Sequence, residues 1–192
     1  MKVTVERIVG WDRVLNSART TIGKNASGNN PSEKFKRKIL ISEHSPIRNL
    51  LFEVVWYDIY YWVAMHLARH HIGFHSGEDD LVFIETQRSD RTGVNRDKTT
   101  QNAPVVFRAV INAHSIINTS RVRLCKVAST ETQQAWYGLI EKLEKIEPDL
   151  FSLCVPNCVY RGFCPEPCSC GYTGTKNYEK QYNTYRVYCS GR

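Results

Sequence analysis

The longest apolar run of the chain, residues 50–67, limits the possible folds more than any other feature of the sequence. Two carboxylates and a histidine interrupt it, whereas a membrane-spanning helix needs about 20 consecutive, predominantly apolar residues. Its first part, LLFEVVWYDI, is rich in β-branched and aromatic residues, which favours a strand, and the following YYWVAMHLARHH has the spacing of a helix. We therefore expect a buried strand that passes directly into a helix.

Other segments add a second strand and further helices. Residues 2–9 alternate between apolar and polar side chains as a strand does, and a loop rich in Gly and Asn precedes a short basic helix near Lys38. Pro104 stands where it can open a helix that continues through residues 105–124. We expect an α+β fold, in which a mixed or antiparallel sheet is flanked by long helices.

A long amphipathic helix is expected from Thr130 to Glu147. Thr130 and Gln133 have the spacing of a capping box, in which each side chain bonds the backbone N–H of the other residue. Pro148 ends the helix. The apolar stripe of this helix consists of Trp136, Leu139, Ile140 and Leu143.

The chain length of 192 residues fits one domain, because a typical domain has roughly 100 to 200 residues. We expect a single domain over residues 1–192, with a cysteine- and tyrosine-rich C-terminal extension from about residue 154. The N-terminus lacks the apolar run of a signal peptide, so we expect a soluble, cytoplasmic protein without membrane association. A net charge of +7 favours anionic partners, whether nucleotides or nucleic acid.

Five of the seven cysteines fall between residues 154 and 170. Their spacings, CxxxC, CxxxC and CxC, differ from the CxxC pairs typical of structural zinc, so we expect no metal site and interpret them as reduced or buried thiols. A zinc-knuckle protein that binds nucleic acid stays open as an alternative, since the chain is basic and its tail is rich in tyrosine.

The helix after the central strand ends in Arg69, His70 and His71. One guanidinium and two imidazoles can donate hydrogen bonds to a phosphate or to the electron-rich edge of a flavin. Further along the chain, Arg121 and Arg123 lie two residues apart and diverge around a helix, so only one of them need face a site. Both groups also fit a solvated basic helix end, which stays open as the alternative.

A polar loop, TQRSDRTGVNRDK, contains a second basic group with Arg88, Ser89 and Arg91. Such a loop can wrap a phosphate with charge-assisted hydrogen bonds, or it can be a solvated basic loop without a ligand. Asp90 and Asp97 reduce its positive charge, which argues against unspecific binding of nucleic acid.

Five segments of the chain resemble segments of flavin-dependent thymidylate synthases, and they follow one another in the same order as in that family. EHSPIRN is similar to the family's HxSPFEH, VAMHLARHH to the approach and start of its signature RHRxxSxNExSxRY, and RLCKVASTETQ to its RxxxxAxxEIR. NSARTTIGK is similar to an AARVSFGK-like segment, and VPNCVYRGFCPEPCSCG to the GPxCxxGxCPExxxxCG tail of some members. The second half of the signature is delayed to residues 87–91, with HSGEDDLVFI or nearby residues as an insertion.

The resemblance implies that the chain reductively methylates dUMP to dTMP, with methylenetetrahydrofolate as the carbon donor and with FAD that NADPH reduces. It also implies a homotetramer whose sites are shared among subunits. The residues that it assigns are Ser45, Arg69, His70 and His71 for FAD, His66, Gln87, Arg88, Ser89 and Arg91 for the nucleotide, and Arg123 and Gln133 for catalysis.

Two positions depart from the family pattern at the expected base pocket. His66 takes the place of a glutamine, and Gln133 takes the place of the arginine that the family is thought to use to polarise the uracil ring. A related flavin-dependent modification of another pyrimidine nucleotide, such as hydroxymethylation, is therefore the alternative reaction.

Overall fold

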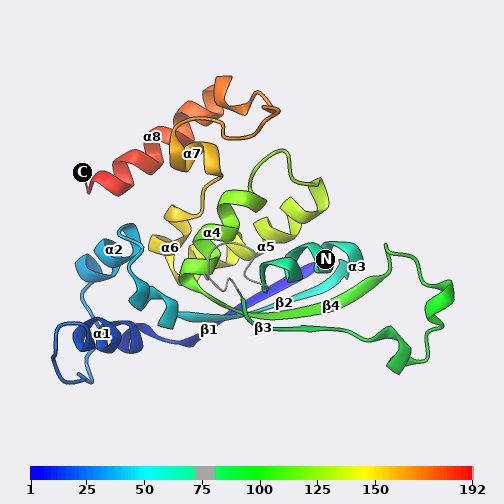
Figure 1. Ribbon diagram of the computed structural model, residues 1–192, viewed down its shortest axis with the longest axis horizontal. Helices are drawn as coiled ribbons and strands as arrows, with labels where there is room; N and C mark the ends of the chain where they lie inside the picture. Colours follow the sequence, from blue (N-terminus) through cyan, green and yellow to red (C-terminus); the bar gives the residue numbers. More distant parts are fainter. Residues whose placement is uncertain (72–80, 192) are drawn as a thin grey trace.

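The computed structural model describes residues 1–71 and 81–191 and shows one antiparallel sheet with α4, α5 and α6 above it in Figure 1. Four strands follow the order β1-β2-β4-β3, and the predicted α+β fold is confirmed. Within the described ranges no helix combines the length and the apolar character that a membrane crossing requires. The elements are β1 (Lys2–Val9), α1 (Trp11–Thr20), α2 (Glu33–Ile41), β2 (Leu51–Tyr60), α3 (Tyr61–Ala68), β3 (Leu81–Thr86), β4 (Pro104–Asn112), α4 (Ala113–Arg123), α5 (Thr130–Ile146), α6 (Pro148–Leu153), α7 (Asn157–Arg161) and α8 (Lys176–Ser190).

The two central strands, β2 and β4, separate an apolar face from a charged face. Successive side chains of a strand point to opposite sides of the sheet. Every second side chain of β2 and β4 therefore points into the core beneath the helices. On the other face Arg108 of β4 pairs with Glu53 of β2 and, at 2.8 Å, with Glu85 of β3. The core residues of these strands are Phe52, Val54, Trp56, Phe107, Ala109 and Ile111, all fully buried.

The segment that begins at Pro104 is a strand and not the helix predicted from the sequence. From Val105 on, every second side chain is buried, as a half-covered sheet requires. Proline is tolerated because it is the first residue of the strand. The helix of this region, α4, begins only at Ala113, where Asn112 Oδ1 accepts the N–H of Ser115 at 2.8 Å.

Helix α5 confirms the predicted long amphipathic helix, and its predicted stripe is buried, but its cap differs. The N-cap is Ser129, so Thr130 already lies within the first turn and the capping-box prediction is wrong. Gln133 instead donates its amide to the carbonyl oxygens of Cys125, at 2.5 Å, and Ala128, at 3.3 Å. This side chain therefore ties the loop between α4 and α5 to the helix.

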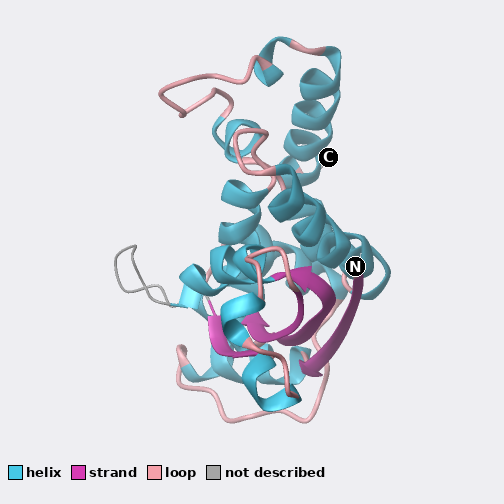
Figure 2. Cartoon of the chain, turned by 90° about the vertical axis from the view of Figure 1, so that its right-hand side faces the viewer, coloured by secondary structure: helices cyan, strands magenta, loops and turns pink. Residues whose placement is uncertain are grey.

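Helices α7 and α8 form an arm at the end of the molecule farthest from the strands (Figure 2). Two arginines of the domain lie over tyrosine rings of this arm. The guanidinium of Arg37 is 4.3 Å from the ring centroid of Tyr188, and that of Arg121 is 3.6 Å from the ring centroid of Tyr160. These cation–π contacts join the arm to α2 and α4. The arm contains most of the predicted extension, and the single-domain organisation stays a prediction.

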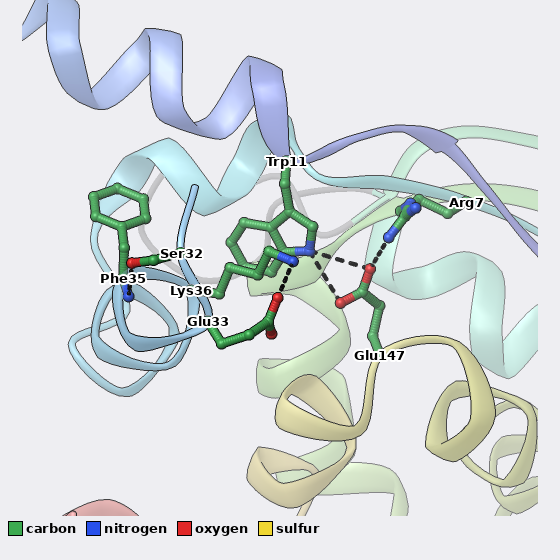
Figure 3. Close-up of polar contacts among 7 residues, drawn as sticks. All are labelled: Arg7, Trp11, Ser32, Glu33, Phe35, Lys36 and Glu147. Carbon is green, nitrogen blue, oxygen red and sulfur yellow. Dashed lines mark hydrogen bonds and ion pairs between the residues drawn. The ribbon is translucent and has the colours of Figure 1, made fainter. Parts of the chain in front are cut away.

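A buried carboxylate connects the start of α1 to the junction of α5 and α6 (Figure 3). Glu147 is 6% exposed, and its two oxygens accept the indole N–H of Trp11 at 3.0 and 3.2 Å. Arg7, near the end of β1, pairs with the same carboxylate. Lys36 of α2 lies over the Trp11 ring, 5.7 Å from its centroid. Glu147 thus joins segments that are 136 and 140 residues apart in the sequence.

We expect Glu147→Gln to lower the free energy of unfolding by about 1–3 kcal/mol, because an amide nitrogen would then face the N–H donors of Arg7 and Trp11. Urea denaturation measures the change. The control is Glu144→Gln on the exposed side of α5, three residues before Glu147, for which we expect a change within about 0.5 kcal/mol. Equal effects of the two substitutions would contradict the role of Glu147 at this junction.

Candidate functional site

Helix α3 lies between two groups of polar side chains. Tyr61 and Met65 share one face of the helix, because residues four apart are neighbours, and Trp62 and His66 share the next. The rings of Trp62 and His66 meet edge to face with 5.2 Å between their centroids. The helix follows β2 without an intervening residue, so the sheet positions both faces directly.

On the Trp62 side, Arg123 reaches the end of α3 from the last turn of α4. Its Nε donates to Nε2 of His70 at 2.8 Å, and a terminal guanidinium nitrogen donates to the backbone oxygen of His66 at 2.8 Å. Nδ1 of His66 lies 3.4 Å from the hydroxyl of Thr132 in α5. We call His66, Arg69, His70, Arg123 and Thr132 the arginine–histidine cluster.

Burial and like charge act together on this cluster. Burial lowers the pKa of Arg123, and the nearby Arg69 guanidinium lowers it further. Burial also lowers the pKa of His66, and the charges of Arg123 and Arg69 add to that shift. Within residues 1–71 and 81–191, neither arginine pairs with a carboxylate. Two neighbouring cations with no counter-charge among the described residues make a place where a bound anion would be stabilised.

The lowered pKa of His66 predicts how the stability of the protein depends on pH. The folded-state pKa lies below the ordinary value of 6.5, so the contribution of the neutral ring is fully present above that value. It is lost as the pH falls through the folded-state pKa, because the unfolded chain binds the proton first. We therefore expect the unfolding free energy of the wild type to fall more steeply below about pH 6.5 than that of His66→Gln, which cannot be protonated.

Urea denaturation at several pH values compares the two slopes. His44→Gln is the matched control, because it removes an exposed histidine and leaves His66 in place. If His66→Gln kept the wild-type slope, His66 would not be the titrating group.

On the Tyr61 side, a pocket of about 350 Å³ opens between α3 and the polar segment after β3. Its volume falls within the range of roughly 300–1,000 Å³ that is common for small-molecule sites. Tyr61 and Met65 line it from the helix. Three of the predicted nucleotide-binding residues line it from the loop, namely Gln87, Arg88 and Ser89.

Internal bonds already hold the polar side chains of this pocket. Oε1 of Gln87 accepts the backbone N–H of Val106 at 3.0 Å. Arg88 donates two hydrogen bonds to the carboxylate of Asp90, at 2.6 and 3.3 Å, and this contact raises the pKa of Arg88. An anionic ligand that binds Arg88 must therefore compete with Asp90 for the guanidinium.

The remaining predicted residues are scattered. Ser45 lines a different groove, beside α2, together with His44 and Pro46. Arg91 is exposed and does not line the 350 Å³ pocket. Gln133 uses its amide to hold the loop before α5, and the side chain of His71 lies outside the described part of the chain. Within one chain, the structure thus gathers the predicted residues around α3 only in part.

The segment interpreted as an insertion, HSGEDDLVFI, is described only in its second part. Its first six residues lie outside the described part of the chain. Its last four begin β3, where Ile84 pairs with Ala109 of β4. These four residues therefore belong to an edge strand of the sheet, and the interpretation of the segment as an insertion stays a prediction.

Sequence reasoning missed Thr132 and the helix wall of the pocket. Thr132 is fully buried on the same side of α5 as Trp136, four residues later. A hydroxyl in an apolar stripe signals a required partner, since buried polar groups are nearly always hydrogen-bonded. Tyr61 and Met65 carry a weaker signal, because aromatic and methionine residues four apart on a helix usually belong to a core.

Solved structures with the same fold include flavin-dependent thymidylate synthases. The enzyme ThyX from Helicobacter pylori, complexed with FAD and dUMP, matches with a TM-score of 0.59 and 16% identity over 81% of this chain and 100% of that chain. A second structure of the Helicobacter pylori enzyme with FAD and dUMP gives 0.59 and 17% over 81% and 99%. The UMP/dUMP methylase PolB from Streptomyces cacaoi, bound with 5-Br dUMP, gives 0.52 and 12% over 84% and 96%.

No family model and no curated protein sequence matches the chain. The likeness to these structures therefore rests on the backbone, and it shows that the chain shares their fold.

Proposed function

We propose that this chain is a flavin-dependent enzyme that modifies a pyrimidine nucleotide, and that its reaction is the reductive methylation of dUMP to dTMP. In that reaction methylenetetrahydrofolate gives up its one-carbon group and becomes tetrahydrofolate, while NADPH supplies two electrons through bound FAD. The observation that carries the proposal is the fold match, since 81% of this chain covers the whole of a thymidylate synthase solved with FAD and dUMP.

The residues present fit a cofactor of this kind. FAD carries a diphosphate, and the arginine–histidine cluster offers Arg69 and Arg123 close together, without a carboxylate partner among the described residues. When bound, the flavin supplies the redox chemistry, so the task of the protein is to bind, orient and exclude water. We assign Arg69, His70 and His71 to FAD, and Arg123 to the contact between flavin and pyrimidine.

The loop side of α3 is assigned to the nucleotide. Gln87, Arg88 and Ser89 line the 350 Å³ pocket, and the guanidinium of Arg88 is the group there that suits a phosphate. Binding would exchange the carboxylate of Asp90 for the phosphate of the ligand. His66 and Arg91 complete the proposed nucleotide site, and Gln133 would reach the base by releasing the carbonyl oxygen of Cys125.

Ser45 lines a groove of its own, and a shared site accounts for that position. We propose a homotetramer in which this groove of one subunit meets the arginine–histidine cluster of another. Analytical ultracentrifugation at micromolar concentration tests the assembly. A monomeric mass in the presence of FAD would contradict the shared site.

Uptake of FAD and formation of product test the function directly. The purified protein should be yellow, or should bind added FAD close to one per chain, and should then form dTMP from dUMP, methylenetetrahydrofolate and NADPH. Mass spectrometry identifies the product. A protein that stays colourless with excess FAD would refute the proposal.

Substitutions of Arg69 and Arg91 should affect the binding of FAD and the binding of dUMP separately. We expect Arg69→Ala to weaken FAD binding roughly tenfold or more, since a lost charge-assisted hydrogen bond costs about 1.5–3 kcal/mol. Arg91→Ala should weaken binding of dUMP and leave FAD affinity unchanged. Titration of each variant with FAD and with dUMP measures both constants. Parallel losses of the two ligands in both variants would show that this division is wrong.

A related modification of another pyrimidine nucleotide is the second candidate. The lowered pKa of His66 favours a neutral ring, and the amide of Gln133 offers a hydrogen bond but no positive charge. A base other than uracil therefore has a chemical reason to fit. Incubation with dUMP and with dCMP, each with methylenetetrahydrofolate and NADPH, separates the candidates by the mass of the product.

A further inference from the structure

Four cysteines from three separate segments line one small cavity of about 10 Å³. Cys125 comes from the loop between α4 and α5, and Cys158 comes from α7. Cys164 and Cys170 come from the segment between α7 and α8. Their thiols are close enough for electrostatic interaction, between Cys125 and both Cys164 and Cys170, and between Cys158 and both Cys125 and Cys164.

The fold thus selects a different set of cysteines from the one that sequence proximity suggests. Cys154 belongs to the sequence cluster but is buried elsewhere, where its thiol donates to the backbone oxygen of Leu150 at 3.3 Å. Cys168 is exposed and does not line the cavity. Cys125 lies about thirty residues before the sequence cluster and takes part in the spatial one. The tail thus contributes three of the sulfurs at the cavity, and Cys125 contributes the fourth.

We propose that Cys125, Cys158, Cys164 and Cys170 form a binding site for a structural zinc ion. Four thiolates in tetrahedral arrangement are a common ligand set of structural zinc, and the ion takes no further ligand there. None of the seven cysteines, all of which lie in the described part of the chain, takes part in a disulfide. The four sulfurs belong to none of the residues proposed for flavin or nucleotide, although the backbone oxygen of Cys125 accepts the amide of Gln133. The zinc proposal does not depend on those assignments.

The sulfurs must move together to hold the ion. As they stand, no three His, Cys, Asp or Glu side chains within residues 1–71 and 81–191 form a ready metal site. Residues 162–171 contain neither helix nor strand, so Cys164 and Cys170 can approach the cavity without breaking a regular element. Closing the site would then supply binding free energy that holds the arm onto the loop after α4.

Metal analysis of the full-length protein, expressed with added zinc, tests the proposal. We expect about one zinc ion per chain in the wild type, as for a closed four-sulfur site. Cys125→Ser and Cys158→Ser should each reduce the zinc content at least fivefold. Cys154→Ser and Cys189→Ser are the matched controls and should keep it, because neither sulfur lines the cavity.

Substitution of zinc by cobalt gives a second measurement that needs no variant. Cobalt bound by four thiolates absorbs strongly in the near ultraviolet and shows tetrahedral bands in the visible range, so a variant that fails to fold does not remove the test. A wild type without stoichiometric zinc and without this cobalt spectrum would overturn the proposal. It would also be overturned if Cys125→Ser, folded by circular dichroism, kept as much zinc as Cys154→Ser.

Discussion

Replacing Arg123 with alanine is expected to reduce the turnover of dUMP by two to three orders of magnitude, which corresponds to about 2.7–4 kcal/mol of transition-state stabilisation. Arg123 is the member of the arginine–histidine cluster that links its histidines, through Nε2 of His70 and the backbone oxygen of His66. Arginine keeps its charge even where burial lowers its pKa, so it supplies a fixed cation in a partly dry site. Steady-state kinetics at saturating FAD measure the loss.

Two variants show whether the loss belongs to the site. Arg123→Lys keeps the charge but not the paired N–H groups, so its turnover should lie between those of the alanine variant and the wild type. Arg13→Ala, an exposed position on α1, should leave turnover unchanged. Thermal melting confirms that each variant is folded. Turnover of folded Arg123→Ala within threefold of the wild type would exclude Arg123 from the active site.

Trp136→Ala is expected to lower the free energy of unfolding by about 3–5 kcal/mol, the usual range for removing a buried tryptophan. The side chain is 1% exposed, and its indole N–H donates to the hydroxyl of Ser120 at 2.9 Å. It thus fills the space between α4 and α5 and also joins them. Because small domains are stable by only about 5–15 kcal/mol, this is the largest stability effect we expect. Urea denaturation measures it.

The next residue along α5 provides the control. Tyr137 is 47% exposed, and Tyr137→Ala should change the unfolding free energy by about 1 kcal/mol or less. Trp136→Phe keeps part of the volume but loses the hydrogen bond, so it should fall between the two. A similar cost for Trp136→Ala and Tyr137→Ala would mean that α5 packs on the sheet through a different face.

Local sequence pattern predicts those elements whose pattern fits only one structure. The change from LLFEVVWYDI to YYWVAMHLARHH marks the end of β2 and the start of α3, and the spacing of the apolar residues of α5 fits a helix and not a strand. Residues 105–112 fit both a buried strand and a helix, since a short apolar run has no distinctive period. Pairing with β2 and β3 decides in favour of the strand, and those strands are distant in sequence.

The candidate site shows the same limit. The order of motifs pointed to Arg69, His70 and Arg123, and the structure places all three at the end of α3. The order of motifs could not show that the Arg88 guanidinium is bonded to the carboxylate of Asp90. Nor could it show that Gln133 is tied to the carbonyl oxygen of Cys125, or that this cysteine faces the tail. Each of these facts depends on a contact between side chain and neighbouring segment that local spacing does not encode.

The two sides of α3 differ in how firmly the fold holds them. Helices α3 and α4 follow β2 and β4 without an intervening residue, so the arginines and histidines of the cluster lie on, or directly after, helices that continue the central strands. The far wall of the pocket belongs to residues 87–103, which contain only short 3₁₀ turns. Backbone amides near the cluster should therefore exchange with deuterated solvent as slowly as those of the sheet, and those of residues 87–103 much faster. A nucleotide would then slow exchange mainly in that segment, which makes it the adjustable half of the site.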